Sequence, residues 1–275
     1  MSALDALVER AQGGDRDALE AVVRGLQDTI YRLALRFLGH PELARDATQE
    51  ILILVVTQLS TFRRQSSVMT WAYRVATRHL LRERRRFRRI TFEALVEEDL
   101  AKAPNAVAPE TLTSAEERLL EEEIFVGCTQ AMLQALDKDQ RIAFVLGAIC
   151  ELASPEAAFV LEISEAAFRK RLSRARAALD AFVAEHCGVA SSAATCRCAY
   201  QVNHAVSQKR LDPAHLRYGS PVAHTSLEAL RALGEIHHVR RSLELYRAQP
   251  SYTLNEDFAK HLRELISRAT ALCTS

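Results

Sequence analysis

A dense group of arginines lies between residues 63 and 89, where Glu83 is the single acidic residue. Trp71 and Tyr73 lie within this group. Aromatic rings stack on unpaired bases while neighbouring guanidinium groups neutralise the sugar–phosphate backbone, and so dense a run of one charge is unfavourable without a polyanionic partner. The pattern predicts contact with melted DNA, although Trp71 taken alone is more typical of a helix core because it shares a face with Val75. The residues expected to make this contact are Trp71, Tyr73, Arg74, Arg78, Arg82, Arg84, Arg85 and Arg86.

A second basic face lies on a helix predicted from Ser164 to about Val183. Its apolar residues recur every three or four positions, as expected of a buried stripe; they are Phe168, Leu172, Ala175 and Leu179. The opposite face carries cations that suit phosphates and guanine edges. A basic face of this kind on an isolated helix is more often simply solvated, but the short helix and tight turn before it favour DNA binding. The predicted contacts are Ser164, Arg169, Lys170, Arg171, Arg174 and Arg176.

A group of thiols and one imidazole opens the C-terminal third of the chain: His186, Cys187, Cys196 and Cys198. Such ligands suit a tetrahedral Zn²⁺, with His204 as an alternative ligand. The same thiols would also suit a redox pair, although a Cys-x-Cys spacing is tight for an intramolecular disulfide. Because the spacing is not a standard metal-binding pair, incidental cysteines in a helical segment are an equally good interpretation. Zinc is therefore an open alternative, and no cofactor is assigned.

The elements that position these groups are expected to be helices. The chain has only nine Gly and seven Pro, and long apolar runs of period two are absent, which favours an all-α fold. Helices are predicted from Ser2 to Gly13, from Asp15 to Gly39, from Pro41 to about Leu59, and from Ser66 into the arginine-rich segment. The helix that begins at Pro41 contains an apolar run, 51–56, that could be a buried strand, but the polar residues on either side favour a helix. After residue 115 the predicted helices are 115–136, one beginning at Asp137, 154–161, 164–183, 199–208, 226–246 and 255–272.

The turn between the helices predicted at 154–161 and 164–183 is tight. Ser154 is expected to cap the helix before it, with Pro155 in the first turn. Ser164 is expected to cap the helix after it. Two helices joined so closely match a helix-turn-helix.

The charges are balanced overall but not along the chain. There are 36 basic and 35 acidic residues, yet 63–89 is strongly basic and 93–123 strongly acidic. Pro104 and Pro109 mark a flexible linker between the two halves. A secretory signal and a membrane-spanning run are both absent from the sequence, so a cytoplasmic location and no membrane partner are expected.

Five segments together resemble the sigma-70 family of RNA polymerase specificity subunits. Residues 46–50 (DATQE) and 59–63 (LSTFR) are similar to its core-binding helix, and 70–76 (TWAYRVA) to the adjoining promoter-melting helix. Residues 136–141 (LDKDQR) and 168–176 (FRKRLSRAR) resemble region 4. Because no segment resembles region 3 or region 1.1, the resemblance is to the extracytoplasmic-function group.

The resemblance implies a domain plan and a set of partners. Residues 1–90 would be region 2, 91–114 an acidic linker, 115–185 region 4, and 186–275 a helical extension, regulatory or metal- or redox-sensing, that could mask the recognition helix. Region 2 would read the −10 element and region 4 the −35 element of promoter DNA, in a signal or stress response. The β′ clamp and β flap of core RNA polymerase would bind the two regions, and an anti-sigma factor is a further candidate partner. The clamp-binding residues would be Asp46, Gln49, Glu50, Ile51 and Leu59.

The sequence departs from the family pattern at the helix-turn-helix. Residues 153–159 (ASPEAAF) replace the usual Gly-Leu-Ser/Thr-x-Glu-Ile-Ala, and Glu162 stands at a turn position that is commonly Gly. Val68 and Met69 also differ from the usual residues. These departures put the promoter sequence in doubt more than the fold.

Three other functions are each compatible with only part of the sequence. A helix-turn-helix regulator that works without core polymerase would explain 154–183 but not 46–50 or 63–89. A metal- or thiol-dependent enzyme lacks a nucleophile–base pair, a phosphate loop and an HExxH motif, so no enzymatic activity is expected. An adaptor that has lost DNA binding is disfavoured by the cations Lys170 and Arg174.

Overall fold

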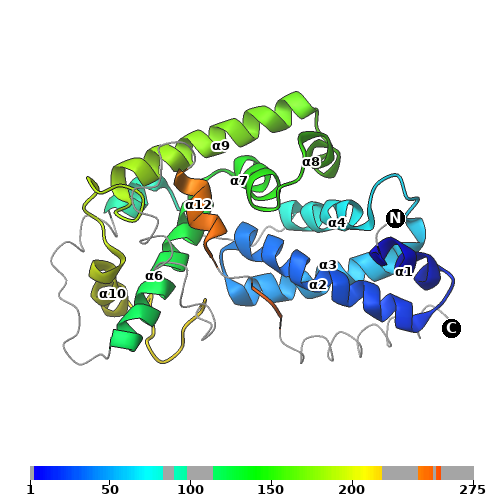
Figure 1. The fold of residues 1–275 in the computed structure, drawn as a ribbon, viewed down its shortest axis with the longest axis horizontal. Helices are drawn as coiled ribbons and strands as arrows, with labels where there is room; N and C mark the ends of the chain where they lie inside the picture. Colours follow the sequence, from blue (N-terminus) through cyan, green and yellow to red (C-terminus); the bar gives the residue numbers. More distant parts are fainter. Residues whose placement is uncertain (1–2, 83–89, 98–113, 219–240, 250–251, 255–275) are drawn as a thin grey trace. The chain divides into compact units, whose positions relative to one another are not determined.

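The computed structural model describes residues 3–82, 90–97, 114–218, 241–249 and 252–254 (Figure 1). These residues are helical, apart from connecting turns and one isolated β-bridge, in which the backbones of Cys187 and Cys196 pair. No strand is found in these ranges. The prediction of an all-α fold is confirmed. The chain divides into two compact units. The first comprises 1–85, 152–168 and 251–275; the second comprises 86–151 and 169–250.

The first unit is built on a long amphipathic helix, α2, against which the neighbouring helices pack (Figure 1). Asp15 caps α2 by accepting a hydrogen bond from the Ala18 amide at 3.0 Å. Gly39 ends it in the left-handed region (φ 72°), donating to the Leu35 carbonyl at 2.8 Å. The predicted start and stop of this helix are confirmed. The helices of this unit are α1 (Ala3–Gln12), α2 (Arg16–Leu38), α3 (Pro41–Gln58), η1 (Leu59–Thr61), α4 (Val68–Arg82) and α8 (Ser154–Leu161).

The apolar run 51–56 is helical, as predicted, and lies in α3. Ile51, Leu52 and Val55 are completely buried, whereas Ile53 and Leu54 are only half-buried. The burial therefore follows the helical period and not the period of a strand. Helix α3 packs against α2 and α4.

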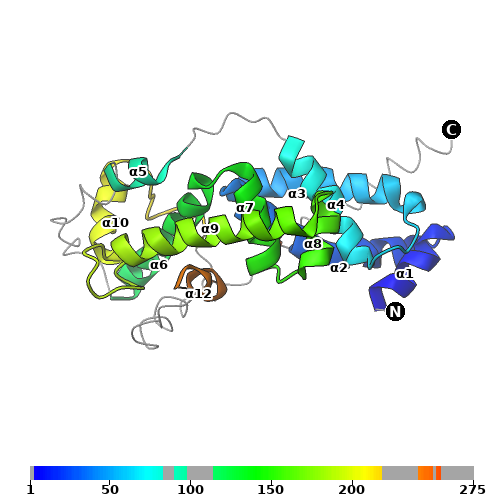
Figure 2. The same cartoon turned by 90° about the horizontal axis from the view of Figure 1, so that it is seen from above.

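Two groups of buried apolar side chains hold helices of the second unit together. In one, Leu120 of α6 packs with Val202 and Ala205 of α10 and with Leu211. Helices α6 and α10 lie side by side in both views (Figures 1 and 2). In the other, Phe144 is fully buried beside Tyr246. The helices of this unit are α5 (Phe92–Leu95), α6 (Ser114–Ala135), α7 (Lys138–Phe144), η3 (Val145–Ile149), α10 (Cys198–Ser207) and α12 (Arg241–Arg247).

Helix α9 (Glu165–His186) begins in the first unit and continues into the second. It follows α8 after the predicted tight turn, in which Glu162 has left-handed backbone angles (φ 56°, ψ 41°). The Ser164 hydroxyl accepts from the Ala167 amide at 3.2 Å, which confirms the predicted cap of α9. The predicted cap of α8 is wrong by one residue. Ala153 takes the N-cap position and has no side-chain acceptor, but the Glu156 carboxylate accepts from the Ala153 amide at 3.3 Å.

Several predictions fall partly or wholly outside the described residues. Most of the linker, 98–113, lies there, and so do most of the helix predicted at 226–246 and all of that at 255–272. Helix α10 lies where 199–208 was predicted to be helical. No helix in the described ranges is long and apolar enough to cross a membrane.

Candidate nucleic-acid interface

Helix α4 has an apolar face on one side and a cationic face on the other. Ala72, Ala76 and Leu80 are fully buried, which fixes α4 against α2 and α3. Because side chains three or four residues apart share a helix face, Arg74, Arg78 and Arg82 follow one another along the other side. Arg74 is half-buried, whereas Arg78 and Arg82 are exposed. Arg84, Arg85 and Arg86 lie outside the described residues.

The two predicted base-stacking rings occupy different environments. Trp71 is half-buried and contacts Phe62, with the ring centroids 5.4 Å apart. Part of its ring therefore remains accessible to a base. Tyr73 is only 8% exposed and belongs to the core of the first unit, so a base could stack on it only after a local rearrangement.

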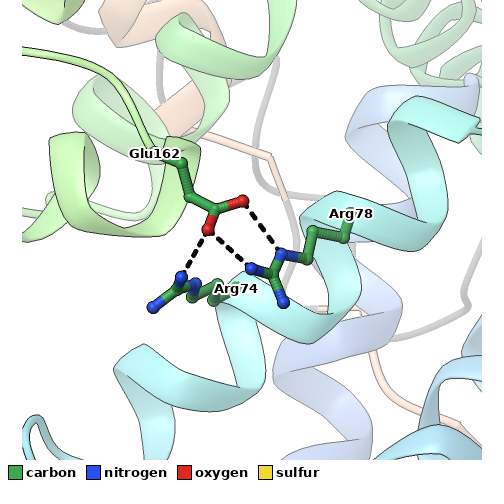
Figure 3. Close-up of polar contacts among 3 residues, drawn as sticks. All are labelled: Arg74, Arg78 and Glu162. Carbon is green, nitrogen blue, oxygen red and sulfur yellow. Dashed lines mark hydrogen bonds and ion pairs between the residues drawn. The ribbon is translucent and has the colours of Figure 1, made fainter.

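The cationic face of α4 is paired with a carboxylate from the turn that follows α8 (Figure 3). Both nitrogens of the Arg78 fork donate to Glu162, Nε to Oε2 at 3.0 Å and a terminal nitrogen to Oε1 at 2.6 Å. Arg74 donates to the same Oε1. The Arg74 guanidinium also lies 4.7 Å from the centre of the Phe159 ring, within the range of a cation–π interaction. All four residues belong to the first unit.

This pairing changes the acidity of the groups involved. Hydrogen bonds from Arg78 and then Arg74 lower the pKa of Glu162 from 4.5 to about 2, because they favour its ionised form. The hydrogen bond to Glu162 correspondingly raises the pKa of Arg78. Near neutral pH the turn therefore presents a full negative charge to two full positive charges.

Helix α9 keeps its apolar and cationic residues apart, as predicted. Phe168, Ala175 and Leu179 are fully buried and Leu172 is 8% exposed. The outer face carries the exposed side chains of Ser164, Arg169, Lys170 and Arg174.

The remaining two predicted arginines of α9 are less available. Arg171 forms an ion pair with Asp139 at 2.8 Å, which ties α9 to the start of α7 within the second unit. Arg176 is half-buried. The structure thus offers Arg169, Lys170 and Arg174 most directly to a ligand.

Of the residues predicted to bind core polymerase, some reach the protein surface and others are buried. Asp46 and Glu50 are exposed and Gln49 is half-buried, all on α3. Glu50 also lies 3.2 Å from His79 of α4. Ile51 is completely buried and Leu59 is 4% exposed, so these two hold α3 in place and present almost no surface to a partner.

The cysteine-containing segment is ordered by backbone bonds. The backbones of Cys187 and Cys196 pair as a parallel β-bridge, and the adjacent Gly188 amide donates to the Cys196 carbonyl at 3.1 Å. Burial raises the pKa of the Cys187 thiol, which disfavours the thiolate that binds metals. His186 packs on Phe182, with ring centroids 4.8 Å apart. Within the described ranges no three His, Cys, Asp or Glu side chains gather as a metal site would need, so this geometry gives zinc no support.

The contact between Glu162 and α4 was missed at the level of sequence. Its signal was present, since Glu162 replaces a residue that is commonly Gly in the resembling family. The partner of that glutamate could not be read from spacing, because Arg74 and Arg78 lie more than eighty residues earlier in the chain.

Two stretches of the chain match families of transcription proteins. Residues 22–90 match the family model described as Sigma-70 region 2, and residues 127–179 match that described as Sigma-70, region 4. The RNA polymerase sigma-H factor of Pseudomonas aeruginosa is 33% identical over 178 residues, which cover 63% of this chain and 90% of the relative. The ECF RNA polymerase sigma-E factors of Escherichia coli and of Salmonella typhimurium are each 28% identical over 178 residues, covering 63% of this chain and 91% of each relative.

Proposed function

Because this chain belongs to the sigma-70 family of RNA polymerase sigma factors, in the extracytoplasmic-function group, we propose that it divides promoter recognition between α4 and α9. As a sigma factor, it directs core RNA polymerase to specific promoters for transcription initiation. In the proposed division, the cationic side of α4 engages the −10 element. The outer face of α9 enters the major groove at the −35 element.

The arrangement of side chains on α9 carries this proposal. One side of the helix is buried in the protein, and the opposite side bears Arg169, Lys170 and Arg174 in exposed positions. Cations on an exposed helix face can reach phosphates and the acceptor atoms of guanine in the major groove. The helix-turn-helix geometry supports the same role, since the second helix of that motif is the one that enters the groove.

Binding to core polymerase is assigned to α3. Asp46, Gln49 and Glu50 supply a polar, acidic surface suited to the β′ clamp, and the β flap would hold the helices of region 4. The protein would act in the cytoplasm, where its polymerase is, without catalysing a reaction of its own, and an anti-sigma factor would be a further partner. A helix-turn-helix regulator that acts without polymerase would account for α8 and α9 but leaves the region 2 match over 22–90 unexplained.

The test removes two cations from the outer face of α9. Lys170→Gln combined with Arg174→Gln should weaken binding of the holoenzyme to a promoter that has a −35 element by about 30-fold or more, because each of the two lost base contacts costs about 1–3 kcal/mol. The measurement is filter binding or run-off transcription with purified core polymerase. Arg16→Gln combined with Arg24→Gln removes the same charge from α2 and should leave binding nearly unchanged. Equal effects of the two double variants would contradict the role of α9.

A further inference from the structure

The turn between α8 and α9 holds an acidic side chain where the backbone favours glycine. Glu162 has φ 56° and ψ 41°, a left-handed conformation that glycine adopts freely and that a residue with a Cβ adopts at a cost. The carboxylate that this position carries is bound by Arg74 and Arg78 of α4. The left-handed backbone of Glu162 costs free energy, but its side chain makes a specific contact with α4, a helix that lies far away in the sequence.

The contact has the form of an anion-binding site. Two arginines one helical turn apart surround one carboxylate, and Arg78 binds both of its oxygens (Figure 3). Arginine forks bind carboxylates and phosphates with the same paired geometry. The oxygens of Glu162 therefore stand where two phosphate oxygens of a DNA backbone would bind.

We propose that Glu162 is an internal competitor of DNA, which occupies the Arg74–Arg78 pair in the free protein and must leave before α4 can hold a promoter strand. This inference rests on the DNA-binding role proposed above for α4. The free sigma factor is then held by its own helix-turn-helix in a state that binds DNA weakly. Binding to core polymerase would favour release by separating α8 from α4.

The strength of the contact suits a reversible restraint. The side chains of Glu162 and Arg78 are 46% and 47% exposed, and that of Arg74 is 27% exposed, so water and salt weaken their attraction. Phe159 adds a ring face to the Arg74 side of the contact. A restraint of this size lowers DNA affinity without preventing the displacement that transcription requires.

The test compares two glutamates that share a φ of 56° and a negative charge. Glu162→Gln removes the charge that faces Arg74 and Arg78. Glu151→Gln is the matched control, because Glu151 also has φ 56° and also pairs with an arginine, Arg247, but lies in the second unit. Both variants change the net charge of the full-length chain equally, so any general electrostatic gain in DNA affinity is the same in both.

The measurement is fluorescence anisotropy of a short labelled single-stranded DNA of mixed sequence, titrated with each full-length protein at low salt. Glu162→Gln should bind roughly threefold to tenfold more tightly than the wild type, as expected for the loss of two solvent-exposed ion pairs. Glu151→Gln should differ by less than about twofold. The advantage of Glu162→Gln should shrink as salt rises and the Debye length falls from about 10 Å at 0.1 M to about 3 Å at 1 M. Equal affinities for the two variants would overturn the proposal.

Two further measurements separate the failure of this proposal from failure of the proposed function. Amide hydrogen exchange of the free proteins should be faster around residues 153–163 in Glu162→Gln than in Glu151→Gln, and unchanged exchange would also overturn the restraint. Run-off transcription with core polymerase tests the function itself, since wild type and both variants should all support it.

Phe159→Ala, which keeps the charge, should give a smaller gain in DNA affinity than Glu162→Gln.

Discussion

Tyr246 offers a direct test of whether the chain beyond region 4 is part of a folded unit. Its side chain is 2% exposed and meets the Phe144 ring edge-on, with centroids 5.4 Å apart. Its hydroxyl donates to the Thr129 carbonyl at 2.9 Å. Ser242 adds to this attachment by donating to Asp180 from its amide at 3.0 Å and from its hydroxyl at 2.6 Å.

Two substitutions separate the ring from its hydroxyl. Tyr246→Phe removes one buried hydrogen bond, which should cost about 1 kcal/mol. Tyr246→Ala also removes the ring and leaves a cavity against Phe144, which should cost about 3–5 kcal/mol by analogy with other buried aromatic residues. Packing is therefore expected to outweigh the hydrogen bond by a factor of about three.

The assay is calorimetry of the full-length protein. A domain of this size loses about 2–4 °C of melting temperature per kcal/mol, so the transition of the second unit should fall by roughly 6–20 °C in Tyr246→Ala and by a few degrees in Tyr246→Phe. The transition of the first unit should not move, which supplies an internal control. A shift in Tyr246→Ala no larger than that in Tyr246→Phe would refute the reasoning.

Three other predictions concern single groups. Arg141→Lys should lower the free energy of unfolding by about 2 kcal/mol in urea titrations, because the single nitrogen of lysine cannot take the place of both guanidinium nitrogens, one of which donates to the Gln134 side-chain oxygen and the other to the Gln134 and Leu136 carbonyls at 2.9 and 3.1 Å. Burial lowers the pKa of this guanidinium to about 10; an unchanged midpoint would show that the fork is dispensable. Asp137→Ala should cost about 1 kcal/mol in the same titration, because its carboxylate caps α7 by accepting from the Gln140 amide at 2.8 Å, whereas Asp137→Asn should cost less. The restraint made by Glu162 should persist above pH 4.5 and be lost as pH falls toward its folded pKa of about 2, because a lowered pKa stabilises the folded form only where the carboxylate is ionised; a carboxyl titration with a midpoint near 4.5 in NMR spectra would contradict this.

Local rules predicted the helices well because the signals are local. Asp15, Gly39 and Ser164 sit at helix ends where their side-chain or backbone properties are needed. The buried stripe of α9 follows from the helical period alone. Even the apolar run 51–56, which resembles a buried strand, was predicted correctly from its polar flanks.

The burial of individual side chains and the pairing of distant helices could not be predicted from the sequence, because both depend on tertiary contacts. Ile51 and Leu59 belong to the motif that suggested binding to core polymerase, yet both are buried. A sequence motif gives the types of residues and their spacing but does not show which of them face solvent. Tyr73 was expected to stack on bases but lies in the core for the same reason. The pairing of Glu162 with α4 required knowledge of which helices meet in space.

The most direct test of the account is run-off transcription with purified core polymerase on a pool of genomic promoter fragments, with and without the full-length protein. The account predicts new transcripts whose start sites share one −10 and one −35 sequence, together with a stable complex of the protein with core polymerase. Absence of both the transcripts and the complex, from folded protein at several salt concentrations, would contradict it.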